Sequence, residues 1–226
     1  MFTIKEGSCN LKMQDVVIVC AGGFGREAYA LIRSINRAAV KENKEEPYNV
    51  LGFLSDDPYA LDEINIDKKI IGTIQEWQPR DSEVYVLGIS NPKAKEKLSN
   101  MLKDRGAKFI SLVSPKVYVP DTTEIGEGSI ISAYSVGENV KIGRFVNIAG
   151  SMIGGNAVIG DYCTTTGFTN ITNAILGKRV FVGSHAVIMN KRKIGDDAFI
   201  CVGSVVFNNV KPGTKVFGIP AKKVNW

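Results

Sequence analysis

Aliphatic side chains recur at intervals of six residues through the second half of the chain. The positions that share this spacing are Ile125, Ile131, Ile142, Ile148, Ile153, Ile159, Ile171, Leu176, Val182, Ile188, Ile194, Ile200 and Val206. A chain that turns at every repeat completes one triangular coil in about 18 residues and stacks the repeated side chains inside as a continuous core. The pattern therefore predicts a β-helix of hexapeptide repeats. The interval shortens between Ile148 and Ile153 and between Ile171 and Leu176, where we expect distorted corners.

The first half follows a different pattern, in which apolar runs alternate with helical segments. Residues 15–20, 50–54 and 83–89 are continuous apolar runs, typical of buried strands. We expect helices over 26–35, where apolar residues recur on one face, and over 93–105. This order predicts a small parallel sheet covered by helices. The fold class we expect is α/β: a Rossmann-like domain in residues 1–113, followed by a left-handed parallel β-helix in residues 114–226.

Composition narrows the kinds of partner. The chain has 226 residues and a net charge of +5, and no basic cluster is interleaved with aromatic residues, so we expect small anionic ligands and no nucleic acid. No apolar run approaches the roughly 18 residues of a membrane-spanning helix, and residues 1–6 lack the layout of a secretory signal. We therefore expect a cytoplasmic protein that does not bind a membrane.

The cysteines carry no metal-binding pattern. Cys9, Cys20, Cys163 and Cys201 show no paired spacing, and His185 is the only histidine. Cysteine and histidine alone therefore cannot supply a zinc site, and we expect free thiols and no metal cofactor.

The chain resembles a known family in its order of parts and in its last repeats. A glycine turn after the first strand, hexapeptide coils and the closing segment 216–223, Val-Phe-Gly-Ile-Pro-Ala-Lys-Lys, follow one another in this sequence. Together they are similar to the two-domain hexapeptide-repeat sugar acyltransferases of the sialic-acid O-acetyltransferase and bacillosamine-pathway N-acetyltransferase type. The resemblance runs from about Val16 to Val224. It implies a homotrimer that transfers an acetyl group from acetyl-CoA to an amine or hydroxyl of a sugar.

The glycine turn is a candidate phosphate site. A dinucleotide fingerprint needs G-x-G-x-x-G, but Cys20 stands at the first glycine position, so only Gly22 and Gly25 remain. Gly22, Gly23, Phe24 and Gly25 nonetheless open a helix, whose free N–H groups and positive dipole end favour an anion. The alternative is a tight turn that needs glycine for steric reasons alone.

Two further loops end strands on the same sheet edge. Asp56 and Asp57 follow the second strand, where a carboxylate can accept hydrogen bonds from a ribose or a base, although two acidic residues before a proline are also ordinary in turns. Gly88, Ser90 and Asn91 follow the third strand. The resemblance implies that these loops and the glycine turn bind the nucleotide of a UDP-linked sugar.

The acetyl-CoA site is expected at the last coils, where grooves lie between neighbouring subunits. The resemblance implies contacts from Gly183, Gly203, Gly218, Pro220, Ala221 and Lys222. Basic residues that suit the CoA phosphates concentrate there, namely Lys191, Arg192, Lys193, Lys211, Lys215, Lys222 and Lys223. A solvated basic rim is the alternative reading of this cluster.

The general base is where this sequence departs from the family. Relatives carry histidine and an acidic residue at the positions that here are Gly155 and Asn156, so both usual groups are absent. His185 lies five repeats further on, on a different wall of the predicted triangle, and reaches that site only across a trimer interface. It is a candidate base, a substrate or CoA contact, or a plain corner residue, while Asn156 is a candidate for orienting the acceptor. A carboxylate such as Asp161 is a further candidate for taking the proton.

Two functions from different classes follow. The leading one is acetyl transfer from acetyl-CoA to a nucleotide-linked, UDP-type amino sugar in surface glycan biosynthesis. The alternative is a catalytically weakened trimeric protein that binds the nucleotide sugar without efficient transfer, because the family histidine is missing at Gly155.

Overall fold

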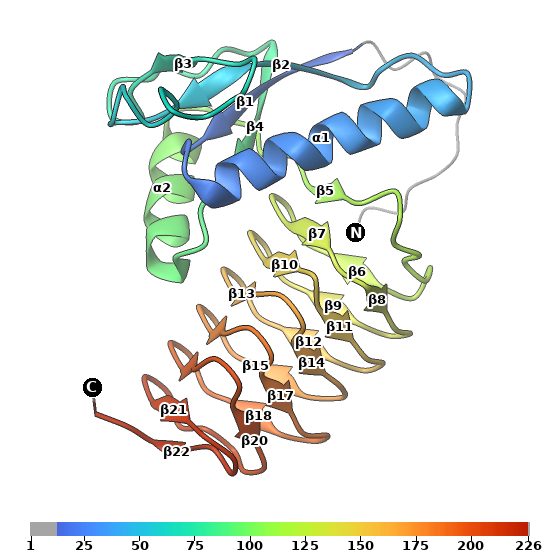
Figure 1. Cartoon of the computed structure of the whole chain (residues 1–226), viewed down its shortest axis with the longest axis vertical. Helices are drawn as coiled ribbons and strands as arrows, with labels where there is room; N and C mark the ends of the chain where they lie inside the picture. Colours follow the sequence, from blue (N-terminus) through green and yellow to red (C-terminus); the bar gives the residue numbers. More distant parts are fainter. Residues whose placement is uncertain (1–12, 226) are drawn as a thin grey trace.

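The computed structural model describes residues 13–225, which form an α/β domain and a three-sided β-helix (Figure 1). The α/β sheet is built from β1 (Gln14–Val19), β2 (Tyr48–Leu54), β3 (Ile70–Gly72) and β4 (Glu83–Leu87). All of its pairings are parallel, in the order β3-β2-β1-β4. The prediction of a small parallel sheet is confirmed. Cys9 lies outside the described residues, and Cys20, Cys163 and Cys201 are free thiols.

Two helices cover opposite faces of this sheet. Helix α1 (Gly23–Lys41) packs on the face that carries Val16 and Ile18, and α2 (Pro92–Asp104) packs on the face that carries Val17 and Val19. This division follows from the two-residue side-chain alternation of a strand. Helix α1 is longer than the apolar pattern predicts, because its exposed last turns continue past the buried residues. No helix between residues 13 and 225 combines the length and hydropathy that crossing a bilayer requires.

Three stacked sheets form the walls of the β-helix. The first wall contains β5 (Leu112–Val113), β7 (Ile130–Ser132), β10 (Asn147–Ala149), β13 (Thr164–Thr165), β16 (Phe181–Val182), β19 (Phe199–Ile200), β21 (Lys215–Phe217) and β22 (Lys222–Lys223). The second wall contains β8 (Ser135–Val136), β11 (Met152–Ile153), β14 (Asn170–Ile171), β17 (Val187–Ile188) and β20 (Val205–Val206). The third wall contains β6 (Glu124–Ile125), β9 (Lys141–Ile142), β12 (Val158–Ile159), β15 (Ile175–Leu176) and β18 (Lys193–Ile194).

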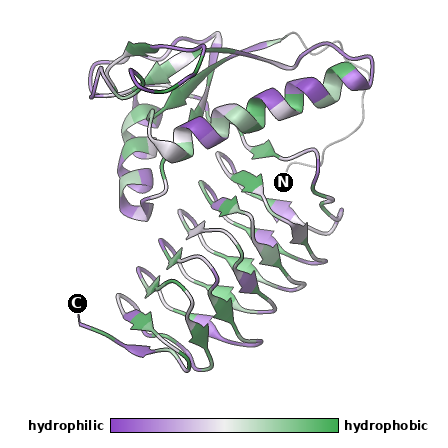
Figure 2. Ribbon diagram, in the orientation of Figure 1, coloured by the Kyte–Doolittle hydropathy of each residue, from purple (hydrophilic) through white to green (hydrophobic). Residues whose placement is uncertain are grey.

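The predicted aliphatic positions stack inside this prism. On the third wall Ile159 pairs with Leu176 and Leu176 with Ile194, so successive coils contain 17 or 18 residues. The interior side chains form one core cluster, and Figure 2 shows hydrophobic strands along the β-helix. The two shortened sides turn at Gly150 (φ 50°) and Asn173 (φ 46°), close to the values at other corners. The two five-residue intervals therefore turn at corners of the same kind as the others, and the distorted corners that we expected there are not observed.

Thr165 is a buried polar residue at an interior position of the repeat. Thr165 pairs with Ile148 below and Val182 above, at a place where the period calls for an aliphatic residue. Its hydroxyl lies 2.8 Å from that of Ser151, and Thr169 donates to Ser151 at 2.7 Å. Burial of these hydroxyls is tolerated because each has a hydrogen-bond partner inside the coil.

The α/β domain packs against the first coils of the first wall. Leu112 and Ile130 belong to this wall, but they are buried in the core of the α/β domain rather than in the interior of the prism. Strand β5 thus already pairs with β7 at the chain position where we place the domain boundary. Helix α2 covers the corner between the third and first walls, where Lys103 pairs with Glu127 at 2.6 Å and Arg179 with Glu96 at 3.2 Å.

Candidate functional site

The glycine turn leaves an open helix N-terminus at the carboxyl edge of the sheet. Gly22 is the N-cap residue of α1, no side chain caps the helix, and its first turn contains no acidic residue. Gly22 and Gly23 are exposed, and a Cβ on either would meet nothing within 4 Å. Because helices α1 and α2 leave β1 and β4 for opposite faces, this edge is the switch point where such sheets bind ligands. The turn can thus approach an anion with its backbone.

The other glycines have a steric role. A Cβ on Gly25 would collide with the carbonyl oxygen of Cys20, and one on Gly88 would lie 2.5 Å from the Gly25 Cα. Both glycines are therefore needed for the close approach of the first turn to the loop after β4. The sequence left two alternatives open, a phosphate site and a turn that needs glycine for steric reasons alone. The steric reason accounts for Gly25, whereas Gly22 and Gly23 leave room for a ligand.

The acidic and amide side chains of the edge already have backbone partners. Asp56 Oδ1 accepts from the Ile74 N–H at 2.9 Å, and Asp57 Oδ1 accepts from the Tyr59 N–H at 3.0 Å. Asn91 caps α2 by accepting from the Ala94 N–H at 3.0 Å. These contacts hold turns and a helix in place, as ordinary turn residues do, and leave the second carboxylate oxygens for other partners.

His185 stands at the corner between the first and second walls. It has φ 59°, and its backbone N–H donates to the Gly167 carbonyl at 3.0 Å. Its ring stacks on Phe168 with centroids 4.9 Å apart and planes at 15°, and Phe168 lies 5.7 Å from Tyr134. Phe168 and Tyr134 are 57% and 61% exposed, so this aromatic column is open. The corresponding column under α2, Phe145 on Tyr162, is buried.

A cleft of about 530 Å³ lies between α1 and the first wall, and its lining includes Phe24 of the glycine turn and Tyr134 of this column. One side comes from α1, including Phe24, Ala28 and Leu31. The other comes from the first wall and its corner, including Tyr134 and Gly167, the residue that bonds to His185. A ligand anchored at the glycine turn can therefore extend toward the corner of the only histidine. Sequence reasoning missed Tyr134 and Phe168, although bulky rings at corners that favour small residues were a visible signal.

Asn156 lies on a different corner, between the second and third walls. It has φ 59°, and its N–H donates to the Glu138 carbonyl at 2.9 Å. Asparagine tolerates this left-handed conformation better than most residues, so the fold by itself accounts for its presence. Within one chain the structure therefore does not bring Asn156 and His185 together, in agreement with the expectation that the two lie on different walls.

Asp161 is poorly suited to take a proton. Burial of its side chain raises the pKa, but hydrogen bonds from the Arg144 N–H at 2.9 Å and the Arg144 guanidinium at 3.1 Å outweigh burial and leave the pKa below its ordinary value. A carboxylate held in this way is a weak base at neutral pH.

The residues expected to contact CoA gather at the last coils. Gly183 packs against the next coil, Gly203 has φ 68° beside open space, and Gly218 has φ 101° next to the cis bond between Ile219 and Pro220. The Ala221 N–H donates to Val205, and Lys222 lies on exposed β22. The basic residues lie on different parts of the prism. Lys191 and Arg192 share the corner between the second and third walls with Asn156, and Lys193 begins β18 on the third wall. Lys211 follows Val210 at the far end of the third wall, and Lys215, Lys222 and Lys223 lie on the first wall.

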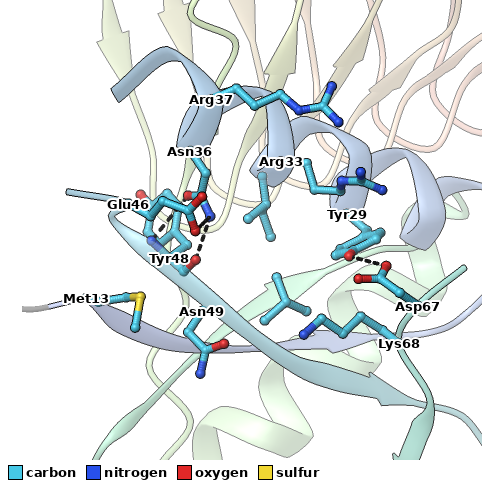
Figure 3. A pocket seen from close by; sticks show the side chains of 12 residues that line it. Met13, Tyr29, Arg33, Asn36, Arg37, Glu46, Tyr48, Asn49, Asp67 and Lys68 are labelled. Atoms are coloured by element: carbon cyan, nitrogen blue, oxygen red, sulfur yellow. Dashed lines mark hydrogen bonds between the residues drawn. The ribbon is translucent and has the colours of Figure 1, made fainter. Parts of the chain in front are cut away.

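A second hollow, of about 310 Å³, contains none of the residues proposed from sequence. It lies between α1, β2 and the loop before β3, and Figure 3 shows that Tyr29 points toward Asp67 and Asn36 toward Glu46 and Tyr48. Tyr29 donates to Asp67 at 2.6 Å, and Asn36 donates to the Tyr48 carbonyl at 2.7 Å. This hollow is on the amino side of the sheet, away from the switch point. Between residues 13 and 225, no group of three or more His, Cys, Asp or Glu residues is arranged to hold a metal ion.

The chain is similar to known proteins in both of its parts. Residues 15–102 match the family described as the PglD N-terminal domain. The chain is 28% identical over 172 residues to the GDP-perosamine N-acetyltransferase of Escherichia coli O157:H7, covering 74% of this chain and 75% of that protein. A match to the bifunctional protein GlmU of Streptococcus uberis, at 27% identity over 108 residues, covers 47% of this chain but only 24% of that protein.

Solved structures agree over almost the whole length. WeeI from Acinetobacter baumannii AYE superposes with a TM-score of 0.78 and 26% identity, over 94% of this chain and all of that one. PerB from Caulobacter crescentus, solved in complex with CoA and GDP-perosamine, shares the fold with a TM-score of 0.76 at 18% identity, over 95% and 99% of the two chains. With a first domain that matches the PglD N-terminal family and a β-helix of hexapeptide repeats, the chain is similar over most of its length to the two-domain hexapeptide-repeat sugar acyltransferases.

Proposed function

We propose that this protein is an acetyltransferase that moves the acetyl group of acetyl-CoA to the amine of a nucleotide-linked amino sugar. The cleft between α1 and the first wall carries this proposal, because one lining contains Phe24 of the open glycine turn, which can receive a phosphate, and Gly167, which bonds to the candidate base His185. Support comes from the GDP-perosamine N-acetyltransferase relative and from the CoA and GDP-perosamine bound to PerB.

We further propose a division of labour between the two parts of the chain. Residues 1–113 bind the nucleotide sugar through the glycine turn, Asp56, Asp57 and the loop after β4. Residues 114–226 bind acetyl-CoA at the last coils. UDP is the nucleotide that we propose first, and synthesis of a surface glycan in the cytoplasm is the proposed role. A GDP-linked amino sugar is the nearest competitor, because GDP-perosamine is the substrate in the relative's name.

The chemistry needs one proton acceptor and little else. The neutral amine attacks the thioester carbonyl, the C–S bond breaks, the CoA sulfur leaves as a thiol with one proton, and the new amide nitrogen loses one. His185 is the group that we propose for the proton transfer, because Asp161 is held as a weak base by Arg144. An amine acceptor lowers the demand on this base, since it attacks a thioester more readily than a hydroxyl does.

We propose that the complete site forms between copies of the chain in a homotrimer. In the proposed trimer the Asn156 corner of one copy faces the His185 corner of a neighbour, so that two separate corners of the prism contribute to one site. The basic residues beside the Asn156 corner then lie near the CoA phosphates.

A thermal-shift and turnover screen tests the function. UDP-, GDP- and dTDP-linked 4-amino sugars are added with and without acetyl-CoA, and release of the CoA thiol is followed. We expect one nucleotide series to raise the unfolding temperature, because a ligand of the folded state stabilises it, and the same series to release CoA. Binding without release for every compound favours the alternative, a nucleotide-sugar-binding protein weakened by Gly155 and Asn156. No binding of any nucleotide sugar contradicts both readings.

A further inference from the structure

Three buried side chains tie the loop after β4 and the start of α2 to the β-helix. Asn147 Nδ2 donates to the Ile89 carbonyl at 2.7 Å, and Thr164 Oγ1 donates to the Ser90 carbonyl at 2.6 Å. In the other direction, Lys95 Nζ donates to the Cys163 carbonyl at 2.6 Å. Each of these bonds joins a side chain to a backbone carbonyl across the boundary between the two parts of the chain.

Asn147 and Thr164 stand where apolar residues would cost less. They pair in register on β10 and β13, on the outward side of the first wall, between Ile130 and Phe181. Each is only 1% exposed, and Asn147 Oδ1 has no hydrogen-bond partner among residues 13–225. A buried amide with one end unsatisfied destabilises the fold relative to an apolar residue of the same shape. The hydrogen bond from the Asn147 amide to the loop is therefore what favours asparagine over an apolar residue at this position.

The opposite side of the same loop bears on the glycine turn. The Gly88 N–H donates to the Val19 carbonyl at 2.8 Å, and Gly88 lies so close to Gly25 that neither tolerates a Cβ. The loop is thus shared: Ile89 and Ser90 bond to the β-helix, while Gly88 touches the turn from which α1 starts. A displacement of the first wall is passed through these contacts to the nucleotide end of the cleft.

We propose that Asn147 and Thr164 are positioning residues. They hold the sheet edge that is proposed to bind the nucleotide in register with the β-helix that is proposed to bind acetyl-CoA. This inference rests on the proposed function, since register matters only if one ligand reacts with another bound elsewhere. Neither side chain needs to touch a substrate. Because displacements of about 1 Å far from the chemistry can cost roughly a hundredfold in rate, a loosened loop lowers turnover more than binding.

The decisive variant is Thr164→Val, which keeps the shape and removes the hydroxyl. We expect kcat to fall about tenfold, while KM for the nucleotide sugar and Kd for CoA stay within about twofold, and Thr164→Ser to restore kcat. We expect the amides of residues 86–95 to exchange with deuterium several times faster than in the wild type, with the last coils unchanged. Asn147→Leu is a second variant with the same expected pattern.

Ser129→Ala is the matched control. Ser129 is fully buried in the β-helix; its hydroxyl donates to the Gly143 carbonyl at 2.8 Å and accepts from the Val146 N–H at 2.9 Å. Its variant therefore loses one buried hydroxyl with two hydrogen bonds but no contact with the loop. An equal loss of kcat in Ser129→Ala, or unchanged exchange of residues 86–95 in Thr164→Val, overturns the proposal. If the wild type transfers no acetyl group, the proposed function fails, and the exchange measurement still decides whether these residues hold the loop.

Discussion

At the scale of single residues, His185 combines a constrained backbone with an exposed aromatic neighbour. The stack on Phe168 and the hydrogen bond to Gly167 fix its ring plane and backbone next to a residue that lines the cleft. A side chain placed in this way loses little rotamer entropy when a substrate arrives, which suits a general base better than a free surface histidine.

Replacing His185 by glutamine should reduce turnover without loosening the fold. General-base catalysis contributes roughly a hundredfold or more, so we expect kcat for CoA release to fall by about that factor. The thermal shift produced by the nucleotide sugar should stay as in the wild type, because the nucleotide end of the cleft is untouched. Turnover unchanged in His185→Gln means that His185 is a corner residue and that the proton leaves by another route.

Lys95 predicts a pH dependence of stability. Burial lowers its pKa to about 7, although Cys163 acts slightly in the opposite direction, and it forms no ion pair with any residue from 13 to 225. Between about pH 7 and the usual lysine range, the unfolded chain therefore binds a proton that the folded chain lacks. The free energy of unfolding then rises with pH, by up to about 1.4 kcal/mol per unit.

This slope is best measured between pH 7 and 8.5. At higher pH the thiols of the half-buried Cys20 and the buried Cys163, whose pKa values burial raises to about 11 and 12, work in the other direction. Urea unfolding of Lys95→Met should show a flatter dependence than the wild type and greater stability at pH 7. Equal slopes in the two proteins would mean that Lys95 is charged when folded.

At the scale of elements, the turn from β1 into α1 contains two glycines with different roles. Gly25 is needed for the close packing of the turn, whereas Gly23 is a candidate for binding a phosphate. A Cβ on Gly25 meets the Cys20 carbonyl, whereas one on Gly23 meets nothing within 4 Å. Two substitutions of the same kind, two residues apart, therefore differ in their physical consequence.

We expect Gly25→Ala to destabilise the protein by more than about 2 kcal/mol, because a backbone clash forces the turn to move. Gly23→Ala should keep or slightly raise the unfolding temperature, since alanine favours a helix, and should weaken the thermal shift caused by a nucleotide sugar. Circular dichroism melts with and without ligand measure both effects. If Gly23→Ala binds the nucleotide sugar as the wild type does, the phosphate does not bind at this turn.

At the scale of the whole molecule, the separation of the His185 and Asn156 corners predicts a shared site. If both residues serve one site between copies, His185→Ala and Asn156→Ala chains should each be impaired. In randomly mixed trimers, about a quarter of the interfaces then combine an intact His185 corner with an intact Asn156 corner. Co-refolding the two variants should restore roughly that fraction of turnover, measured as CoA release per trimer.

Sedimentation of the mixture provides the control for this experiment, because the recovered activity must travel with the trimer. Recovery of no activity from two impaired variants would place the whole site within one chain. A protein that sediments as a single chain while it transfers acetyl groups would contradict the trimer outright.

The β-helix could be predicted from sequence because its core repeats locally. Each coil places the same kind of side chain at the same point of the turn, so the period identifies Ile159, Leu176 and Ile194 as one stack before any contact is known. The parallel sheet followed for a similar reason, since apolar strands that alternate with helices leave few arrangements. Thr165 escaped the pattern because the hydroxyls that satisfy it come from other turns of the coil.

The tertiary structure alone decided how the two halves meet. Asn147 and Thr164 are ordinary polar residues in the sequence, and only the packing of residues 88–91 on the first wall gives them partners 58 and 74 positions away in the chain. It likewise placed Phe24 and Gly167 on one cleft and kept Asn156 away from His185. The local period identifies the side chains that stack inside each coil. Contacts between distant segments depend on the three-dimensional path of the chain, which no short stretch of sequence contains.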